Sequence, residues 1–262
     1  MTISSPHDFA PNPAALVDAP RWPTGIAALD AALAGGLAYG RLHEIYAGDA
    51  DDAAAAAGFA ALLAMGLCGR GSKSFIWLHH RRAMQLCGIM QGQGLAELGI
   101  AVQHCLFVQT EDGKGLLKAG LDAVRCGGLG AVILQGHGRM PELDLTASRR
   151  LVLAAQRSGV ALLLLRLEAE PVPSAAETRW LVRSAPSVAL AAQAPGLPCF
   201  DIELLRQRAG PCGMGWRLEW DRDQAIFRDA ALSGAVVPVS FDRPLADPRG
   251  GDSSGDGLAK VA

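Results

Sequence analysis

Short apolar segments recur along the chain, and segments with helical periodicity separate them. The apolar segments cover residues 42–46, 74–78, 105–109, 131–134 and 160–165. They lack the alternation of apolar and polar side chains that a half-exposed strand shows, so both faces of each strand are expected to be buried. Strands of this kind, joined by helices, form a mostly parallel sheet with helices on both sides and right-handed crossovers. The sequence therefore predicts an α/β fold.

The segments between these strands have the periodicity of helices. We expect helices over residues 24–33, 51–68, 82–98, 115–128 and 146–159. In the first of them Ile26, Leu29 and Leu33 share one face, and Thr24 is the expected N-cap. The second is rich in alanine, which has the highest intrinsic helix propensity.

The pattern changes after Pro171. Residues 200–208 and 215–221 alternate apolar with polar side chains and flank the sequence AGPCGMG. Alternation on either side of a glycine-containing turn is typical of an antiparallel hairpin. We therefore expect a hairpin over about residues 199–221 at the C-terminal edge of the sheet, followed by a short piece over 224–229.

The 262 residues suit one α/β domain, which we expect over residues 22–246. Residues 1–21 are rich in Pro and Ala without a clear period, and residues 247–262 are rich in Gly, Ser and Asp. These compositions predict a mobile arm and a disordered tail. The six Cys include no CxxC pair, and the chain shows neither a signal-peptide pattern nor an apolar run long enough to span a bilayer. Together they favour a cytoplasmic protein that contacts no membrane. The net charge of -2 gives no overall attraction to DNA.

The segment RLHEIYAGDADDAAAAAGF, residues 41–59, has the order of strand, glycine turn and helix that a phosphate-binding loop requires. Such a loop also needs a Lys for the β- and γ-phosphates and a Ser or Thr hydroxyl for Mg²⁺. Residues 47–71 contain none of these. The loop instead carries the carboxylates of Asp49, Asp51 and Asp52, which would repel a triphosphate. We interpret them as solvated residues at the positive end of a helix, and a metal site is the alternative.

Residues 24–59 resemble the entry to the core of bacterial RecA recombinases, in which a helix and a glycine-rich segment lead through a strand into the phosphate loop. The resemblance continues in order through FIWLHH, residues 98–134 and ALLLLR. With AAETRWLVRSAPS and the late ELLRQRAG and WRLEWD included, the chain is most similar to the ImuA family. These are RecA-like accessory proteins of the damage-inducible mutasome, sometimes labelled SulA-like. The resemblance implies a RecA-like fold and a role in the SOS response and in mutagenesis.

The residues that hydrolyse ATP in the recombinase are replaced at the matching positions. The phosphate-loop Lys corresponds to Ala53, the Mg²⁺-binding hydroxyl to Ala54, the water-activating Glu to His79 and the Mg²⁺-binding Asp to Gln135. Because phosphoryl transfer depends on these groups, the resemblance implies no ATPase activity, no catalytic residue, no metal and no cofactor. The degenerate phosphate loop comprises Ala47, Gly48, Asp49, Asp51, Asp52, Ala53 and Ala54, and the degenerate cleft comprises His79, Gln135 and His137. A metal or catalytic site in that cleft is the alternative to a polar, silent one.

Arginine supplies most of the positive charge after Arg139, and three Trp are interleaved with it. Arg beside Trp is typical of protein interfaces. We expect AETRWLVRSAPS to form a short helix, ended by Pro186, that presents Trp180 and Arg183 on one face. A solvated face of ion pairs and plain packing against the sheet are the alternatives. The residues predicted to bind a partner are Arg179, Trp180, Arg183, Arg206 and Arg208.

The resemblance to the ImuA family implies a non-catalytic scaffold of error-prone translesion DNA synthesis. The implied partner is an ImuB-like, catalytically inactive Y-family polymerase homologue, and through it a replicative-type error-prone polymerase. Contact with the RecA recombinase, nucleoid association in the complex and weak or no direct DNA binding are further expectations. Three alternatives stay open: a SulA-type cell-division inhibitor, an atypical RecA-like ATPase, and a DNA-binding protein that uses the arginines.

Overall fold

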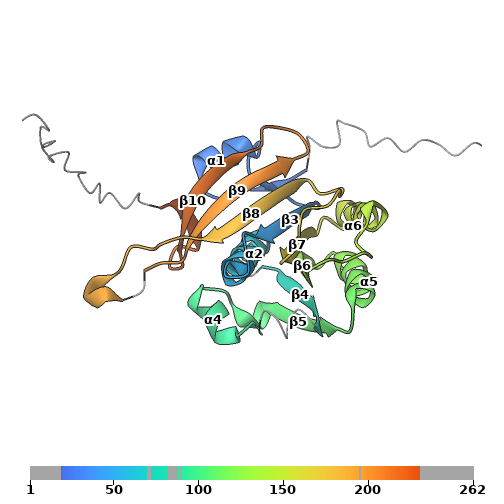
Figure 1. Ribbon diagram of the computed structural model, residues 1–262, viewed down its shortest axis with the longest axis horizontal. Helices are drawn as coiled ribbons and strands as arrows, with labels where there is room; N and C mark the ends of the chain where they lie inside the picture. Colours follow the sequence, from blue (N-terminus) through green and yellow to red (C-terminus); the bar gives the residue numbers. More distant parts are fainter. Residues whose placement is uncertain (1–18, 70–71, 82–87, 89, 195, 231–262) are drawn as a thin grey trace, which may run out of the picture. The chain divides into compact units, whose positions relative to one another are not determined.

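Nine strands form one sheet in the part of the chain that the computed structural model describes, which is residues 19–69, 72–81, 88, 90–194 and 196–230 (Figure 1). Their order across the sheet is β11-β10-β9-β8-β3-β7-β6-β4-β5. In chain order they are β3 (Leu42–Ala47), β4 (Ser74–His80), β5 (Cys105–Thr110), β6 (Leu129–His137), β7 (Ala161–Leu167), β8 (Thr178–Ser184), β9 (Cys199–Gln207), β10 (Met214–Asp221) and β11 (Ile226–Asp229). Each of the five apolar segments of the sequence forms a strand, as predicted.

The sheet has a parallel half and an antiparallel half. Neighbouring strands are parallel from β8 through β3, β7, β6 and β4 to β5. The pairs β8–β9, β9–β10 and β10–β11 are antiparallel. The β9–β10 hairpin is the one predicted from the alternating segments, and β11 is the short piece that follows it. The fold class is therefore confirmed: a mostly parallel sheet flanked by helices, with an antiparallel hairpin at its C-terminal edge.

Helices cover the two faces of the sheet unequally. The helices are α1 (Ala27–Ala32), α2 (Ala53–Leu67), α4 (Gly92–Glu97), α5 (Gly113–Val124) and α6 (Leu145–Ser158), with 3-10 turns η2 (Val102–His104) and η3 (Ala191–Gln193). One hydrophobic cluster joins α1, α2 and α4 to one face of the sheet, from β4 across to β11. A second cluster joins α5 and α6 to the other face of β3, β7, β6 and β4. No described residue of β8 to β11 belongs to this second cluster.

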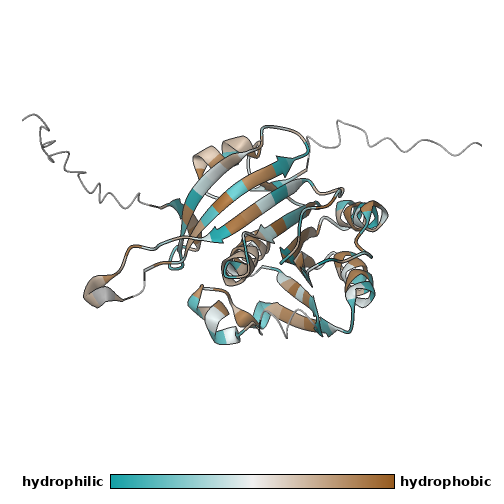
Figure 2. Cartoon of the chain, in the orientation of Figure 1, coloured by the Kyte–Doolittle hydropathy of each residue, from teal (hydrophilic) through white to brown (hydrophobic). Residues whose placement is uncertain are grey.

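Among the described residues, the antiparallel strands therefore have one covered face and one face without a helix. Along β8, β9 and β10, hydrophobic and hydrophilic residues alternate (Figure 2). Trp180, Ile202 and Leu218 point into the first cluster. We call the opposite side the helix-free face, and the side chains that define it are Leu181, Arg183, Asp201, Glu203, Arg217 and Glu219. Ion pairs link Arg217 to Asp201 at 2.6 Å and Arg183 to Glu203 at 3.8 Å on this face.

The helix predicted for AETRWLVRSAPS is wrong, because Thr178–Ser184 is strand β8. This strand pairs with β3 on one side and β9 on the other, so both edges of its backbone find hydrogen-bond partners. Its buried residues repeat every second position, which is the period of a strand. Trp180 and Arg183, three residues apart, therefore point to opposite faces instead of sharing one.

Two further predictions about helices differ from the structure. α1 begins at Ala27 with Ile26 as its N-cap, not Thr24. The Thr24 hydroxyl accepts the Ile26 N–H at 3.3 Å and donates to Asp30 Oδ1 at 2.8 Å, so it stabilises the turn before the helix. Of the helix expected over residues 82–98, only α4 is helical in the described part. The prediction is wrong at residues 88, 90 and 91, and residues 82–87 and 89 lie outside the description.

All described residues belong to one compact unit that ends at Ala230. The predicted arm over 1–21 lies outside the description except at its end, where Arg21 begins strand β1 (Arg21–Trp22), which pairs with β2 (Leu37–Ala38). The predicted tail over 247–262 and the expected domain end at 246 also lie outside it. None of the helices in the described ranges has the length and apolarity to cross a membrane.

Candidate functional site

The loop between β3 and α2 has the position of a phosphate-binding loop, but three of its backbone N–H groups, those of Gly48, Asp51 and Asp52, donate within the chain. The Gly48 N–H donates to the Val182 carbonyl of β8 at 2.9 Å. The N–H groups of Asp51 and Asp52 donate to Asp49 Oδ1 at 2.9 and 3.2 Å. A phosphate loop works by pointing such N–H groups at the ligand. Here the Val182 carbonyl and the Asp49 carboxylate accept these three N–H groups in place of an external anion.

Side chains fill the space beside the same loop. The interpretation of the loop aspartates as solvated is wrong for Asp52, which is only 6% exposed. Its Oδ1 accepts the N–H and the hydroxyl of Ser184 at 2.7 and 2.8 Å. A Cβ atom on Gly48 would lie 2.5 Å from Asp52 Oδ2 and 2.7 Å from Arg183 Cγ. Asp52 and Arg183 therefore occupy the volume directly above Gly48. The loop is tied to the end of β8 rather than open to a ligand.

The side chains at the nucleotide positions do not compensate for this closure. Ala53 is half-buried and Ala54 is exposed at the start of α2, and a methyl group neither donates to a phosphate nor binds Mg²⁺. Asp49, Asp51 and Asp52 add negative charge at the same place. The residues present therefore do not fit a bound nucleoside triphosphate with Mg²⁺.

The degenerate cleft lies at the carboxyl ends of β4 and β6. His79 and Gln135 are opposite each other in the β4–β6 ladder. Gln135 Oε1 accepts the indole N–H of Trp77 at 2.8 Å, so a structural partner fixes this side chain. Burial lowers the pKa of His79, and the neighbouring charge of His80 lowers it further. Both effects favour the neutral imidazole.

His137 does not join His79 in a metal site. Its Nε2 lies 3.4 Å from the Glu168 carboxylate, beyond the end of β6. Within the described ranges, no group of three or more His, Cys, Asp or Glu side chains is arranged to hold a metal ion. The three cleft residues lie at the carboxyl ends of the neighbouring strands β4 and β6, but Gln135 is bonded to Trp77 and His137 lies beside Glu168.

A buried polar cluster that sequence analysis missed lies on the opposite side of β3 from α2. Glu44 is fully buried, and Arg179 Nε donates to its Oε2 at 2.7 Å. The Arg179 guanidinium also lies 5.7 Å from the centroid of the Tyr46 ring. Arg166 is 2% exposed and donates through Nη2 to the Gly138 carbonyl at 2.8 Å. Burial lowers the pKa of Arg166, while Tyr46 and Glu44 oppose that change. One sequence signal was present: Glu44 and Arg166 are charged residues inside otherwise apolar strands.

The five residues predicted to bind a partner separate into a buried and an exposed group. Arg179 pairs with Glu44, and Trp180 is 2% exposed with its indole N–H donating to Thr178 Oγ1 at 2.8 Å. These two side chains lie in the interior, so they are not part of the free surface. Arg183, Arg206 and Arg208 are exposed at the ends of β8 and β9.

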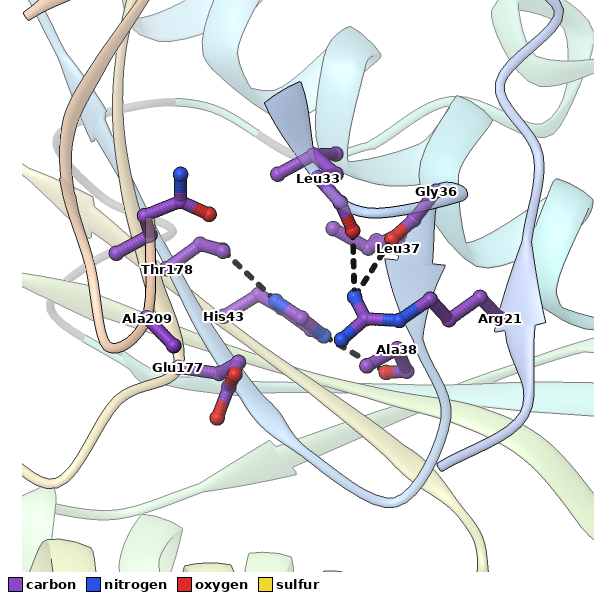
Figure 3. Close-up of a pocket in the computed structure, with 10 residues that line it drawn as sticks. Arg21, Leu33, Gly36, Leu37, Ala38, His43, Glu177, Thr178 and Ala209 are labelled. Atoms are coloured by element: carbon purple, nitrogen blue, oxygen red, sulfur yellow. Dashed lines mark hydrogen bonds between the residues drawn. The ribbon is translucent and has the colours of Figure 1, made fainter. Parts of the chain in front are cut away.

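A small hollow between β1, β2 and β3 has a polar lining (Figure 3). Its volume of about 10 Å³ would hold at most one water molecule. Arg21 Nη1 donates to the carbonyls of Leu33 and Gly36 at 2.7 and 3.1 Å, and His43 lies between Thr178 and Ala38 (Figure 3). Arg21, His43 and Gln207 bond to backbone carbonyls of the chain or to Thr178, which makes this a structural junction and not a ligand site.

The chain was compared with known proteins in sequence and in structure. No protein-family model matches the chain, and no curated protein matches it in sequence. Among solved structures, the chain is similar to the crystal structure of the RadB recombinase, with a TM-score of 0.53 and 14% identity over 80% of this chain and 100% of that chain. The chain has a RecA-like fold. At this identity the likeness concerns the fold, so the site has to be interpreted from its own residues.

Proposed function

We propose that the chain is a non-catalytic, RecA-like accessory protein of damage-induced, error-prone translesion DNA synthesis. In this proposal its partner is an ImuB-like, inactive homologue of Y-family polymerases. Through that partner it supports a replicative-type error-prone polymerase, and it also contacts the RecA recombinase. The proposal combines the resemblance to the ImuA family with the RecA-like fold.

The observation that carries the non-catalytic part is the closed loop after β3. A RecA-like ATPase would need free N–H groups, a Lys and a hydroxyl at this place. In this chain the N–H groups of Gly48, Asp51 and Asp52 have acceptors within the chain, and alanines stand at the two side-chain positions. The fold is then used to present surfaces and not to turn over nucleotide.

The surface we assign to the partner is the helix-free face together with the exposed arginines at the strand ends beside it, Arg183, Arg206 and Arg208. It carries charged side chains on strands that a helix does not cover, and Arg183, Arg206 and Arg208 are exposed along its edge. Exposed Arg side chains suit charge-assisted contacts with carboxylates of a protein partner.

Co-purification tests this proposal. The tagged full-length chain is challenged separately with the ImuB-like homologue, the recombinase and the tubulin-like division protein of its own organism. We expect stable capture of the ImuB-like homologue, weakened when Arg183, Arg206 and Arg208 are replaced together by Glu. Capture of the division protein alone would overturn the proposal in favour of a SulA-type inhibitor.

Calorimetric titration with Mg·ATP tests the non-catalytic part separately. We expect no measurable heat at micromolar protein concentrations, because the loop donors are already engaged. A micromolar dissociation constant would show that the closed loop opens for nucleotide, and an atypical ATPase would then be the better assignment.

A further inference from the structure

An open groove lies between α5 and α6, on the face of the sheet opposite α2. The two helices run side by side there (Figure 1). The groove has a volume of about 330 Å³, and the residues that line it are Leu121, Arg125, Arg150, Leu153, Ala154, Arg157 and Ser158. Three of these seven side chains are guanidinium groups and none is a carboxylate. The lining is therefore both cationic and apolar.

The positive charge of this groove is not neutralised by α6 itself. The helix contains three Arg and no acidic residue between Leu145 and Ser158. Arg150 and Arg157 form no ion pair with any described residue, whereas Arg183 and Arg217 on the helix-free face each have an acidic partner. Arg125 has Asp122 at 3.3 Å, but both side chains are more than half exposed, so water screens this pair. On a chain with a net charge of -2, this is a local concentration of cations.

The apolar part of the groove is also unusual for a free surface. Leu153, which lines the groove, is 49% exposed; Leu145, two turns earlier on α6 and outside the lining, is 39% exposed. The core does not need them, because Leu151, Val152 and Ala155 already supply the contacts of α6 with the second hydrophobic cluster. Leucines between arginines on an exposed helix face give a surface that both an apolar anchor and a carboxylate would recognise.

We propose that this groove binds an acidic segment of a partner protein, most simply an amphipathic helix with leucine-like anchors and glutamates or aspartates beside them. Charge complementarity selects the acidic residues, and Leu121 and Leu153 select the apolar anchor. A nucleic acid fits less well. No aromatic side chain lines the groove, so bases would have no ring to stack on, and its leucines have no favourable contact with phosphates. This proposal does not depend on the proposed function, because the groove is separate from both the loop and the helix-free face.

Fluorescence anisotropy with a designed probe tests the proposal on the full-length chain. The probe is a labelled helical peptide of about twenty residues with leucines at i, i+3, i+4 and i+7 spacing and glutamates elsewhere. The test variant is Arg150→Glu with Arg157→Glu, and the charge-matched control is Arg139→Glu with Arg222→Glu, at exposed positions outside both the groove and the helix-free face. Leu153→Ser removes the apolar anchor without changing the charge. All of these residues are exposed, and unfolding curves would verify that each variant is folded.

We expect the Arg150 and Arg157 reversal to weaken binding of the probe at least about tenfold and the control to change it less than about twofold. Leu153→Ser should weaken it as well, and added salt should weaken wild-type binding. The proposal is overturned if a matching peptide with lysines in place of glutamates binds equally well, or if all variants bind like wild type.

Two other occupants are distinguished by the same variants. A labelled single-stranded oligonucleotide that binds more tightly than the peptide, and is lost with the same two arginines, would assign the groove to nucleic acid and overturn the proposal. Self-association of the wild-type chain that disappears in Leu153→Ser, measured by sedimentation, would assign the groove to a second copy and overturn it too.

Discussion

The parallel and antiparallel halves of the sheet differ in what their strands can expose. All seven residues of β7, in the parallel half, are buried, because helices cover both of its faces. In β10, in the antiparallel half, the first four residues alternate between half-buried and exposed. A strand buried on both faces has only its ends available for function, whereas a strand buried on one face offers the whole opposite face. In the described ranges, the loop at the end of β3 in the parallel half is tied to β8, whereas the antiparallel half has a charged face that no helix covers.

The junction between the halves is itself chemically distinctive. Strands β3 and β8 meet there, and Glu44 of β3 lies opposite Arg179 of β8 in the ladder. His43 of β3 reaches Thr178 of β8 through its Nδ1 at 2.8 Å. Polar side chains on both faces of β3 thus connect the two halves, and the predictions that follow test how much the connection contributes.

The largest effect should come from breaking the buried ion pair at this junction. Replacing Arg179 by Ala leaves the fully buried Glu44 carboxylate without its partner, which should lower the free energy of unfolding by about 3–5 kcal/mol. Urea denaturation measures this loss. The control is the joint replacement of Glu44 and Arg179 by Leu, which leaves no buried charge and should lose much less. A loss below about 1 kcal/mol in Arg179→Ala would mean that the pair does not join the halves.

The same apolar truncation should have unequal effects in the two halves. Leu164 in β7 is fully buried, and Leu164→Ala should cost about 2–5 kcal/mol of stability. Leu181 in β8 is half-buried on the helix-free face, and Leu181→Ala should cost less than about 1 kcal/mol. Denaturant midpoints of the two variants give the comparison directly. Equal losses would show that the helix-free face is covered in solution.

The His43 contact predicts how stability depends on pH. Its Nε2 lies 2.9 Å from the Ala38 carbonyl, which only accepts, so Nε2 carries the proton and Nδ1 accepts from the Thr178 hydroxyl. Burial lowers the pKa of His43 from 6.5 to about 4. The contribution of neutral His43 to the free energy of unfolding is therefore complete above pH 6.5 and decreases as the pH falls toward 4. Over that range the unfolded chain takes up a proton that the folded chain does not.

The titration of His43 should lower the free energy of unfolding by on the order of 3 kcal/mol across this pH range. The free energy of unfolding, measured by urea titration at several pH values between 7 and 4, gives the slope. His43→Gln cannot titrate, and its stability should fall less steeply than that of wild type. Parallel pH profiles for the two proteins would contradict the assignment of a neutral, buried His43.

The smallest effect is expected from restoring the missing side chains of the phosphate loop. Ala53→Lys with Ala54→Thr supplies the amine and the hydroxyl, but Asp49 and the Val182 carbonyl still hold the backbone donors. We expect calorimetry to show no micromolar binding of Mg·ATP to this double variant. Binding would show that the side chains alone were limiting and that the loop opens readily.

The parallel half could be predicted from the sequence in some detail. Apolar segments such as residues 131–134 and 160–165 have to be buried on both sides, and that requirement is local. The alternation in residues 200–208 and 215–221 likewise predicted the hairpin that β9 and β10 form. The alanines at positions 53 and 54 are visible in the sequence without any structure.

Strand β8 could not be predicted in the same way. Its sequence, TRWLVRS, is short enough to suit a helix face as well as a strand, and a helix was the wrong choice. The strand is favoured because β3 and β9 offer hydrogen-bond partners on both sides, and these come from distant parts of the chain. Because a helix was predicted in place of this strand, Arg179 and Trp180 were wrongly placed on the surface. A helical period assigns side chains of a strand to the wrong faces.

By itself, the sequence determined which segments are buried and which chemical groups the loop after β3 lacks, because apolar periodicity and residue identity are local properties. The tertiary structure decided which groups meet. Glu44 and Arg179 are 135 positions apart in the chain, and Asp52 and Ser184 are 132 apart. Such contacts exist because β8 pairs with β3, and that pairing depends on the free energy of the whole sheet and not on either segment alone.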